Sequence, residues 1–206
     1  MSHPLNARLL GAAAVLALAA PPAVAQQAAP LKAVEQSLAA TGSMTARFTQ
    51  ADGRGRTQSG TLSLKRPGKI RFEYGAGANM LLVGDGKNLT FIDYEVGQKS
   101  AWPIARSPLA VLLSPQPNLS WIARIEPQPN PGVVIVRARD ARRPEFGTLL
   151  LAFSKNSSAP GGLMLEGWTA IDAQNKRTTV KLDGQRYNVS IPESAFTYSE
   201  PQKRKR

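Results

Sequence analysis

Side chains able to perform chemistry are few in this chain of 206 residues. It contains no cysteine and a single histidine, His3, close to the N-terminus. A cysteine nucleophile, a Ser-His-Asp triad and a zinc site made of Cys or His therefore lack their components in the rest of the chain. An enzyme of this composition would depend on carboxylates, lysines or a bound cofactor.

Two other patterns resemble catalytic or binding motifs without completing them. Asp93 and Glu95 lie two residues apart and could act as an acid and base pair. No neighbouring residue type supports that role, so we interpret them as exposed charges. Neither Lys-Ser nor Lys-Thr completes a phosphate-binding loop after the glycines Gly53, Gly55 and Gly60. We therefore expect no enzyme activity, no metal site and no cofactor.

Arg66 stands out by its position in an alternating pattern. It lies an even number of residues after Leu62 and Leu64, and side chains at such positions share one face of a strand. This parity predicts that the guanidinium points toward the same apolar face as the two leucines. A buried cation is costly unless it finds carbonyl groups or a carboxylate. The alternative is that the strand ends at Lys65 and Arg66 turns toward solvent.

The remaining pattern predicts one short helix followed by many strands. Leu31, Val34 and Leu38 have helical spacing within residues 31–40, and Gly42 offers a stop. Residues 26–30 are expected to form a linker. From Met44 onward the period changes to two, with hairpin turns between the alternating segments. About ten strands are predicted, within residues 44–50, 57–65, 69–74, 80–83, 89–94, 98–102, 121–126, 133–139, 148–153, 163–171 and 177–182.

A second helix interrupts the strands. Ser107 and Pro108 are typical of a helix N-cap and first helical residue, and Leu109, Leu112 and Leu113 follow at helical spacing. A single sheet has an apolar face that such helices can cover. The predicted fold class is mainly β (α+β), a curved antiparallel sheet with short helices packed on its concave face.

The two ends of the chain differ in character from the middle. Residues 1–25 have a short cationic start, an apolar run of twelve residues, Pro21-Pro22 and an Ala-x-Ala site, which is typical of a signal peptide cleaved after Ala25. Residues 26–200 form the predicted single domain, and residues 201–206 form a basic disordered tail. The formal net charge of +12 falls to +11 with the loss of Arg8, and such a basic protein favours acidic surfaces.

A family resemblance rests on two neighbouring motifs. The segment 65–74, which contains Arg66-Pro67, is followed by the segment 82–89, which contains Asp85-Gly86. Together with Phe48-Thr49-Gln50, they resemble the signature of the periplasmic outer-membrane lipoprotein carriers, the LolA family. The order of signal peptide, helix, strands, short helices and further strands fits that family over nearly all of the chain.

The resemblance implies an unclosed β-barrel with an apolar cavity under a helical lid. In that family the Arg of the Arg-Pro pair hydrogen-bonds the lid, and acyl chains displace it. Carried over to this sequence, that role falls on Arg66. The lid is predicted to contribute Leu109, Leu112 and Leu113. The acyl-binding wall is predicted to comprise Leu62, Leu64, Ile70, Phe72, Met80 and Leu82, although the sequence leaves the relative facing of separate strands open.

The function implied is a periplasmic chaperone that carries acylated lipoproteins from the inner to the outer membrane. The expected partners are those lipoproteins and an inner-membrane ATP-driven transporter, and the outer-membrane receptor is unknown. We expect no nucleic-acid partner, and we expect the protein to be a monomer. Two alternatives stay open: a periplasmic lipid- or polyanion-binding protein of the same fold, and a lipid-sensing regulatory domain. The tryptophans, which are unevenly spaced, are expected to pack in the core or at its rim: Trp102, Trp121 and Trp168.

Overall fold

The fold is given by a computed structural model that describes residues 23–75 and 78–202. The predicted signal peptide up to residue 22 and the end of the basic tail, residues 203–206, lie outside the described residues. Among the described residues, no helix is long and apolar enough to cross a membrane. The described part of the chain contains two α-helices and four 3₁₀ turns: α1 (Ala23–Ala40), η1 (Ile104–Arg106), α2 (Ala110–Leu113), η2 (Pro144–Phe146), η3 (Pro160–Gly162) and η4 (Glu193–Phe196).

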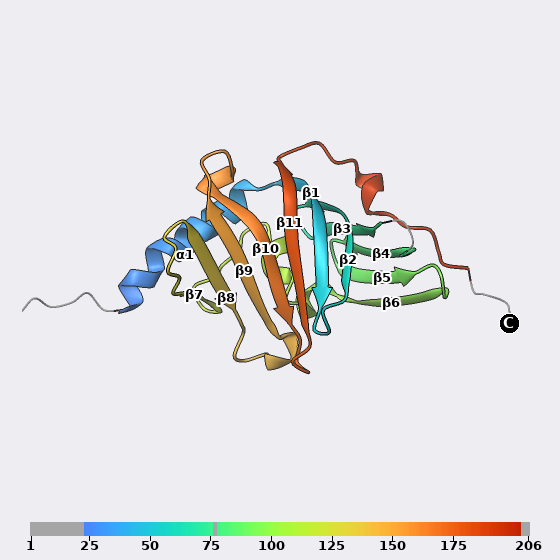
Figure 1. Cartoon of the computed structure of the whole chain (residues 1–206), viewed down its shortest axis with the longest axis horizontal. Coiled ribbons are helices and arrows are strands. Elements are labelled where there is room, and N and C mark those ends of the chain that lie inside the picture. The colour runs from blue at the N-terminus through green and yellow to red at the C-terminus, as the bar shows by residue number, and fades with distance from the viewer. Residues whose placement is uncertain (1–22, 76–77, 203–206) are drawn as a thin grey trace, which may run out of the picture.

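Over residues 23–75 and 78–202, eleven antiparallel strands form one sheet (Figure 1). They are β1 (Ser43–Asp52), β2 (Thr57–Lys65), β3 (Lys69–Tyr74), β4 (Met80–Asp85), β5 (Asn88–Asp93), β6 (Gln98–Pro103), β7 (Ala123–Glu126), β8 (Val133–Ala138), β9 (Thr148–Lys155), β10 (Leu163–Ile171) and β11 (Arg177–Tyr187).

The sheet is continuous but does not close. Its strand order is β6-β5-β4-β3-β2-β1-β11-β10-β9-β8-β7, so β6 and β7 are its two edges. Every neighbouring pair is a sequence-adjacent pair except β1 and β11, which run from Met44 opposite Tyr187 to Asp52 opposite Thr178. This pairing of the first and last strands joins the two halves into one curved sheet. The alternating pattern predicted a curved antiparallel sheet, but not which distant strands pair.

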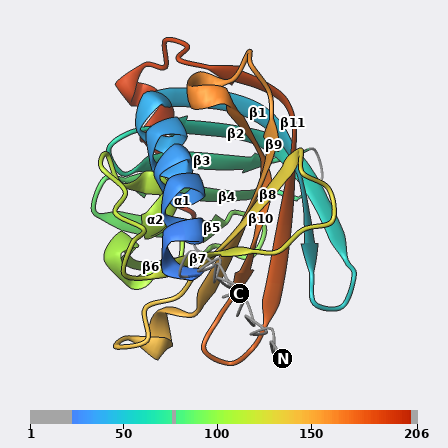
Figure 2. The same ribbon diagram turned by 90° about the vertical axis from the view of Figure 1, so that its left-hand side faces the viewer.

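The concave side of this sheet holds the main hydrophobic core. Figure 2 shows α1 lying across the concave side, with α2 beside it. Leu31, Val34 and Leu38 of α1 are buried in one cluster with side chains from both halves of the sheet. Burial of such side chains stabilises the fold by about 1.5–3 kcal/mol each. The helices are therefore part of the core rather than an addition to its surface.

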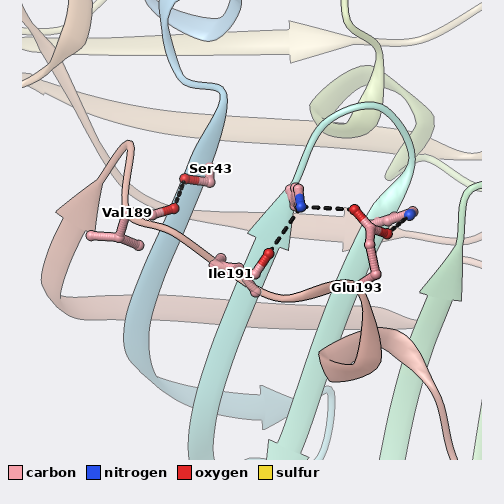
Figure 3. Close-up of polar contacts among 6 residues, drawn as sticks. Ser43, Val189, Ile191 and Glu193 are labelled. Carbon is pink, nitrogen blue, oxygen red and sulfur yellow. Dashed lines mark hydrogen bonds and ion pairs between the residues drawn. The ribbon is translucent and has the colours of Figure 1, made fainter.

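The outer face of the sheet is covered in part by the chain that follows β11. Ile191 and Phe196 pack with Leu81, Val83 and Ile92, which form a second, smaller cluster on that face. Polar contacts hold this C-terminal segment in place (Figure 3). Ser43 Oγ donates to the carbonyl of Val189 at 2.5 Å, and Lys65 Nζ donates to the carbonyl of Ile191 at 2.9 Å.

The Lys65 ammonium also donates to Glu193 Oε1 at 2.7 Å, and Lys69 donates to the other oxygen of the same carboxylate. These contacts tie η4 to the ends of β2 and β3. The alternating pattern could not predict this segment, because residues 188–202 have neither a strand period nor a helical period.

Several predicted boundaries were wrong. The predicted linker at residues 26–30 is helical, because α1 begins at Ala23 in an alanine-rich stretch of high helix propensity. The second helix begins at Ala110 rather than Pro108. Ser107 Oγ accepts a bond from the Leu109 amide at 3.2 Å, but the first turn is not regular helix.

Several strand ends also differ from the prediction, and three of them have a clear structural reason. β7 begins at Ala123 rather than Trp121, since the amides of Ile122 and Ala123 both bond to the Leu119 carbonyl in a turn. β5 ends at Asp93, one residue early, because the Asp93 carboxylate caps the following turn. β11 continues to Tyr187, five residues past the predicted end, because its pairing with β1 continues that far.

Candidate functional site: a helix-covered concave face and Arg66

Arg66 connects the sheet to both α-helices. It follows directly after β2, and its Nε donates to the carbonyl of Leu112 in α2 at 2.9 Å. Its Nη1 donates to the carbonyl oxygens of Leu38 and Thr41, at the C-terminal end of α1. The strand does end at Lys65, but the guanidinium turns inward to main-chain carbonyls rather than outward to solvent.

The charge of Arg66 is therefore held by dipoles rather than by a carboxylate. Burial lowers the pKa of its guanidinium to about 10, so the group stays protonated at neutral pH. Carbonyl oxygens at a helix C-terminus have no partner within the helix, and a cation there is favourable. A single side chain thus satisfies the ends of two helices that come from distant parts of the sequence.

The Arg-Pro and Asp-Gly motifs meet at the same place. Gly68, directly after Arg66-Pro67, donates its amide to the carbonyl of Leu113 in α2 at 3.0 Å. Gly68 has a φ of +73°, and a Cβ added there would lie 2.6 Å from the Cα of Gly86. Only glycine fits this left-handed position against a second backbone. The turns that contain the two motifs of the family resemblance are therefore in contact with each other, and the first of them is hydrogen-bonded to α2.

Register settles which strand residues share a face. Leu62 lies opposite Phe72, Phe72 lies opposite Leu82, and Leu64 lies opposite Ile70, so these five side chains belong to one face of β2, β3 and β4. Four of them are fully buried in the main core, whereas Leu82 is partly buried and packs against that core.

Met80 has the same parity as Leu82 but is only partly buried. It lies at the start of β4, opposite Asp93, and is not among the residues of the main core. Of the six side chains predicted for the wall, it is therefore the one nearest to the rim of the concave face.

The predicted lid residues meet the same core. Leu112 and Leu113 are fully buried, and Leu109 is partly buried against the cluster. The structure thus brings α2 and the predicted wall together, with the α2 leucines inside the space that the sheet encloses.

An aromatic cluster on the concave face was missed by the sequence analysis. Phe48 packs edge-on against Phe72 and Tyr74, with ring centroids 5.0 Å and 5.2 Å apart, and Phe72 packs edge-on against Trp168 at 5.9 Å. These rings come from β1, β3 and β10, so they connect the two halves of the sheet. The alternation around Phe48 was visible in the sequence, but which strands it joins was not.

The packing of α1 on the concave face was predicted, but its polar contacts were missed. Glu35 Oε1 accepts the amide of Leu119 at 2.6 Å, and Ser37 Oγ lies 2.7 Å from the carbonyl of Pro160. A Cβ added at Gly161 would lie 2.6 Å from the Cα of Ser37. Hence α1 is packed tightly against the β9–β10 turn and against the segment before β7, in addition to its bond with Arg66.

The candidate acid and base pair lies at the end of β5 and in the turn that follows it. Asp93 Oδ1 accepts the amides of Glu95 and Val96 in the turn after β5, at 3.0 Å and 3.2 Å. Within residues 23–75 and 78–202, no three side chains of His, Cys, Asp or Glu lie close enough to bind a metal ion. The two residues therefore build a turn.

A separate pocket lies on the other half of the sheet. Its volume is about 470 Å³, and it contains none of the six predicted wall residues. Gly167 is among its lining residues, and most of the lining side chains come from the face opposite the core, such as Ile135, Leu150 and Thr179. It is distinct from the concave face.

The sheet is an unclosed antiparallel barrel, and two helices cover its apolar concave face. These features define the class of protein: a β half-barrel with a helix-covered apolar interior. Comparison with known proteins then gives the family. The outer membrane lipoprotein carrier protein LolA family matches residues 39–199. The chain belongs to this family.

Individual relatives are similar over almost their whole length. The chain is 30% identical over 202 residues to an outer-membrane lipoprotein carrier protein of Bordetella avium, covering 93% of this chain and 92% of the relative. It is 27% identical over 201 residues to the protein of that name from Chromobacterium violaceum, covering 94% and 93%. A solved LolA superfamily protein from Nitrosomonas europaea has 11% identity and a TM-score of 0.46, covering 82% of this chain and 97% of that protein.

Proposed function

We propose that this protein is a periplasmic carrier that binds the acyl chains of lipoproteins released from the inner membrane and delivers them toward the outer membrane. The observation that carries the proposal is the apolar concave face, closed by two helices that hydrogen-bond the same guanidinium, that of Arg66. The names of the relatives support lipoproteins as the cargo.

In this mechanism acyl chains and α2 compete for the same space. The α2 leucines are packed into the core, so loading requires α2 to move away and Arg66 to release the Leu112 carbonyl. Burial of an acyl chain contributes about 0.8 kcal/mol per methylene group. The lost helix packing offsets part of this gain, which keeps the net affinity in a range that permits release.

The wall proposed for the acyl chains comprises Leu62, Leu64, Ile70, Phe72, Met80 and Leu82. The proposed lid residues are Leu109, Leu112 and Leu113, and the proposed latch is Arg66. The energy for extraction from the membrane is proposed to come from an inner-membrane ATP-driven transporter. Export by a signal peptide cleaved after Ala25 would place the monomeric carrier in the periplasm.

The first test identifies what the protein carries. The wild-type protein and Arg66→Leu are recovered from the periplasm under mild conditions, and bound molecules are identified by mass spectrometry. We expect acylated lipoproteins on both, enriched on Arg66→Leu because the weakened latch favours the open state. Phospholipid alone on both proteins, or no bound molecule, would contradict the proposal.

A matched control separates the latch from a general effect of losing a buried arginine contact. Arg71 Nη1 also donates to a main-chain carbonyl, that of Thr197 at 3.0 Å, but on the outer face of the sheet. Arg71→Leu should carry the wild-type amount of lipoprotein. In a second comparison, Leu82→Glu should lose binding of a fluorescent fatty acid at low and high salt alike, since the proposed wall is apolar.

A further inference from the structure

Three connections and one strand start lie at the same end of the sheet, the lower end in Figure 1. They are the β1–β2 turn (residues 52–56), the β8–β9 connection (139–147), the β10–β11 turn (171–177) and the residues before β7. The register places them together: Asp52 lies opposite Thr178, Ile171 lies opposite Thr148, and Ala138 lies opposite both Leu149 and Ala123. We call this surface the basic end.

Three of the four acidic side chains at the basic end, the aspartates, accept hydrogen bonds within their own loops, whereas Glu145 is exposed. Asp52 Oδ1 accepts the amides of Arg54 and Arg56 at 2.9 Å and 3.0 Å. Asp140 Oδ1 accepts the amide of Arg142 at 2.9 Å in the same way. In the third turn, Asp172 Oδ1 accepts two amides, at 2.9 Å and 2.8 Å. Each of these three aspartates stabilises its turn through bonds to backbone amides.

Basic side chains at the basic end are directed outward. The three connections contain seven Lys or Arg residues against four Asp or Glu. Arg56 and Arg143 pair with the aspartate of their own loop. The other five are exposed and form no ion pair with a described residue: Arg54, Arg139, Arg142, Lys176 and Arg177.

A large exposed aromatic residue borders the same surface. Trp121 is 88% exposed. The residue after it, Ile122, accepts the amide of Arg139 through its carbonyl at 2.6 Å, so Trp121 lies next to the β8–β9 connection. An exposed tryptophan beside arginines is typical of surfaces that settle into the headgroup layer of a membrane.

We propose that the basic end binds the surface of a bilayer that contains anionic phospholipids. The unpaired cations supply the long-range attraction, and Trp121 inserts its ring at the level of the headgroups. A soluble polyanion or an acidic protein would use the cations equally well but would leave the exposed indole unexplained. This proposal is independent of the acyl-chain cargo, and it gives the membrane contact to the folded domain rather than to the C-terminal residues 203–206.

Cosedimentation with vesicles tests it. The purified protein is mixed with vesicles of phosphatidylcholine alone or with one third phosphatidylglycerol, at 50 mM and 200 mM salt. We expect binding to the anionic vesicles alone, weakened by salt. Each basic residue near an anionic surface contributes about 1 kcal/mol, so the triple variant Arg54→Gln, Arg142→Gln, Arg177→Gln should bind about 100-fold more weakly. Trp121→Ala should also weaken binding, with little change in its salt dependence.

Two controls decide whether the basic end is responsible. The variant Lys87→Gln, Lys155→Gln, Arg186→Gln loses the same charge outside this surface and should bind as the wild type does. Removal of residues 203–206 should change binding by less than the triple variant. Equal losses in both triple variants, a loss confined to the tail deletion, or binding to polyphosphate without binding to vesicles would each overturn the proposal.

Discussion

The Arg66 guanidinium donates through two different nitrogens to carbonyls of two helices, α1 and α2. A lysine at this position would keep the charge but would replace the planar fork with three N–H donors that all diverge from one nitrogen. It could therefore not satisfy the carbonyls of Leu112, Leu38 and Thr41 together. The geometry of the donor, and not only its charge, is what couples the two helices.

Replacing Arg66 with lysine should therefore loosen α2 while the sheet stays folded. Loss of one hydrogen bond to a charged group costs about 2 kcal/mol, which corresponds to an increase of about 30-fold in local opening. Hydrogen exchange should be faster by that factor at the amides of Leu113 and Ser114. The amide of Val180, in the centre of the sheet, should exchange at the wild-type rate. Unchanged exchange at α2 would show that the helix does not depend on the guanidinium.

Gly68 permits a second test at the scale of one residue. A left-handed conformation costs a residue with a Cβ about 1–2 kcal/mol, and at Gly68 the new atom would also collide with the backbone of Gly86. Gly68→Ala should therefore lower the free energy of unfolding by at least about 3 kcal/mol in urea titrations. Gly55 has a similar φ of +79° with no atom within 4 Å of an added Cβ, so Gly55→Ala should cost only about 1 kcal/mol. Equal losses would mean that the contact between the two turns is unimportant.

At the scale of elements, the strands could be predicted better than the helices. The period of two placed β2, β3 and β10 at their observed bounds, because each is half buried in a sheet with one apolar face. The helix α2 is only four residues long, and its leucines are buried by tertiary contacts rather than by a complete amphipathic face. The leucine spacing predicted that a helix forms here, but its start was placed two residues too early, at Pro108.

The C-terminal segment gives a prediction for its dependence on pH. Hydrogen bonds from Lys65 and then Lys69 lower the pKa of the Glu193 carboxyl to about 2. The unfolded chain has the ordinary glutamate pKa of 4.5, so the contribution to stability is present above about pH 5 and is lost as the pH falls toward 2. Acid should therefore release η4 from β2 and β3 before the sheet unfolds.

Glu193→Gln removes this pH dependence. Amides of residues 194–197 should exchange faster in the variant than in the wild type at pH 7, and the difference should shrink near pH 2. Exchange rates are compared after correction for intrinsic chemistry. Glu145→Gln, which changes an exposed glutamate in η2, serves as the matched control and should not alter this segment. A constant difference between pH 7 and pH 2 would contradict the linkage.

At the scale of the molecule, the least predictable feature is the pairing of β1 with β11. It joins residues as far apart as Met44 and Tyr187, and no local pattern specifies which distant strands pair. Which side chains of separate strands lie on the same face of the sheet depends on the same long-range register. The inward direction of the Arg66 side chain could be predicted from the alternating pattern of its strand. Its hydrogen-bond partners in α1 could not be identified without the tertiary structure.

The competition between α2 and cargo predicts two opposite effects of one substitution. Leu112→Ala empties part of the core, which should lower the free energy of unfolding of the empty protein by about 2–5 kcal/mol. The same change leaves more room for an acyl chain and removes packing that loading must break. Fatty-acid binding should therefore become tighter although the fold becomes less stable.

Leu149→Ala distinguishes this competition from a general loosening of the core. Leu149 is equally buried in the same cluster, but it belongs to β9 and not to a helix that has to move. Its replacement should lower stability by a similar amount and leave fatty-acid binding unchanged or weaker. Urea unfolding and fluorescent fatty-acid titration measure the two quantities on the same samples. If both variants bind more tightly, the extra space alone explains the effect, and α2 does not compete with the cargo.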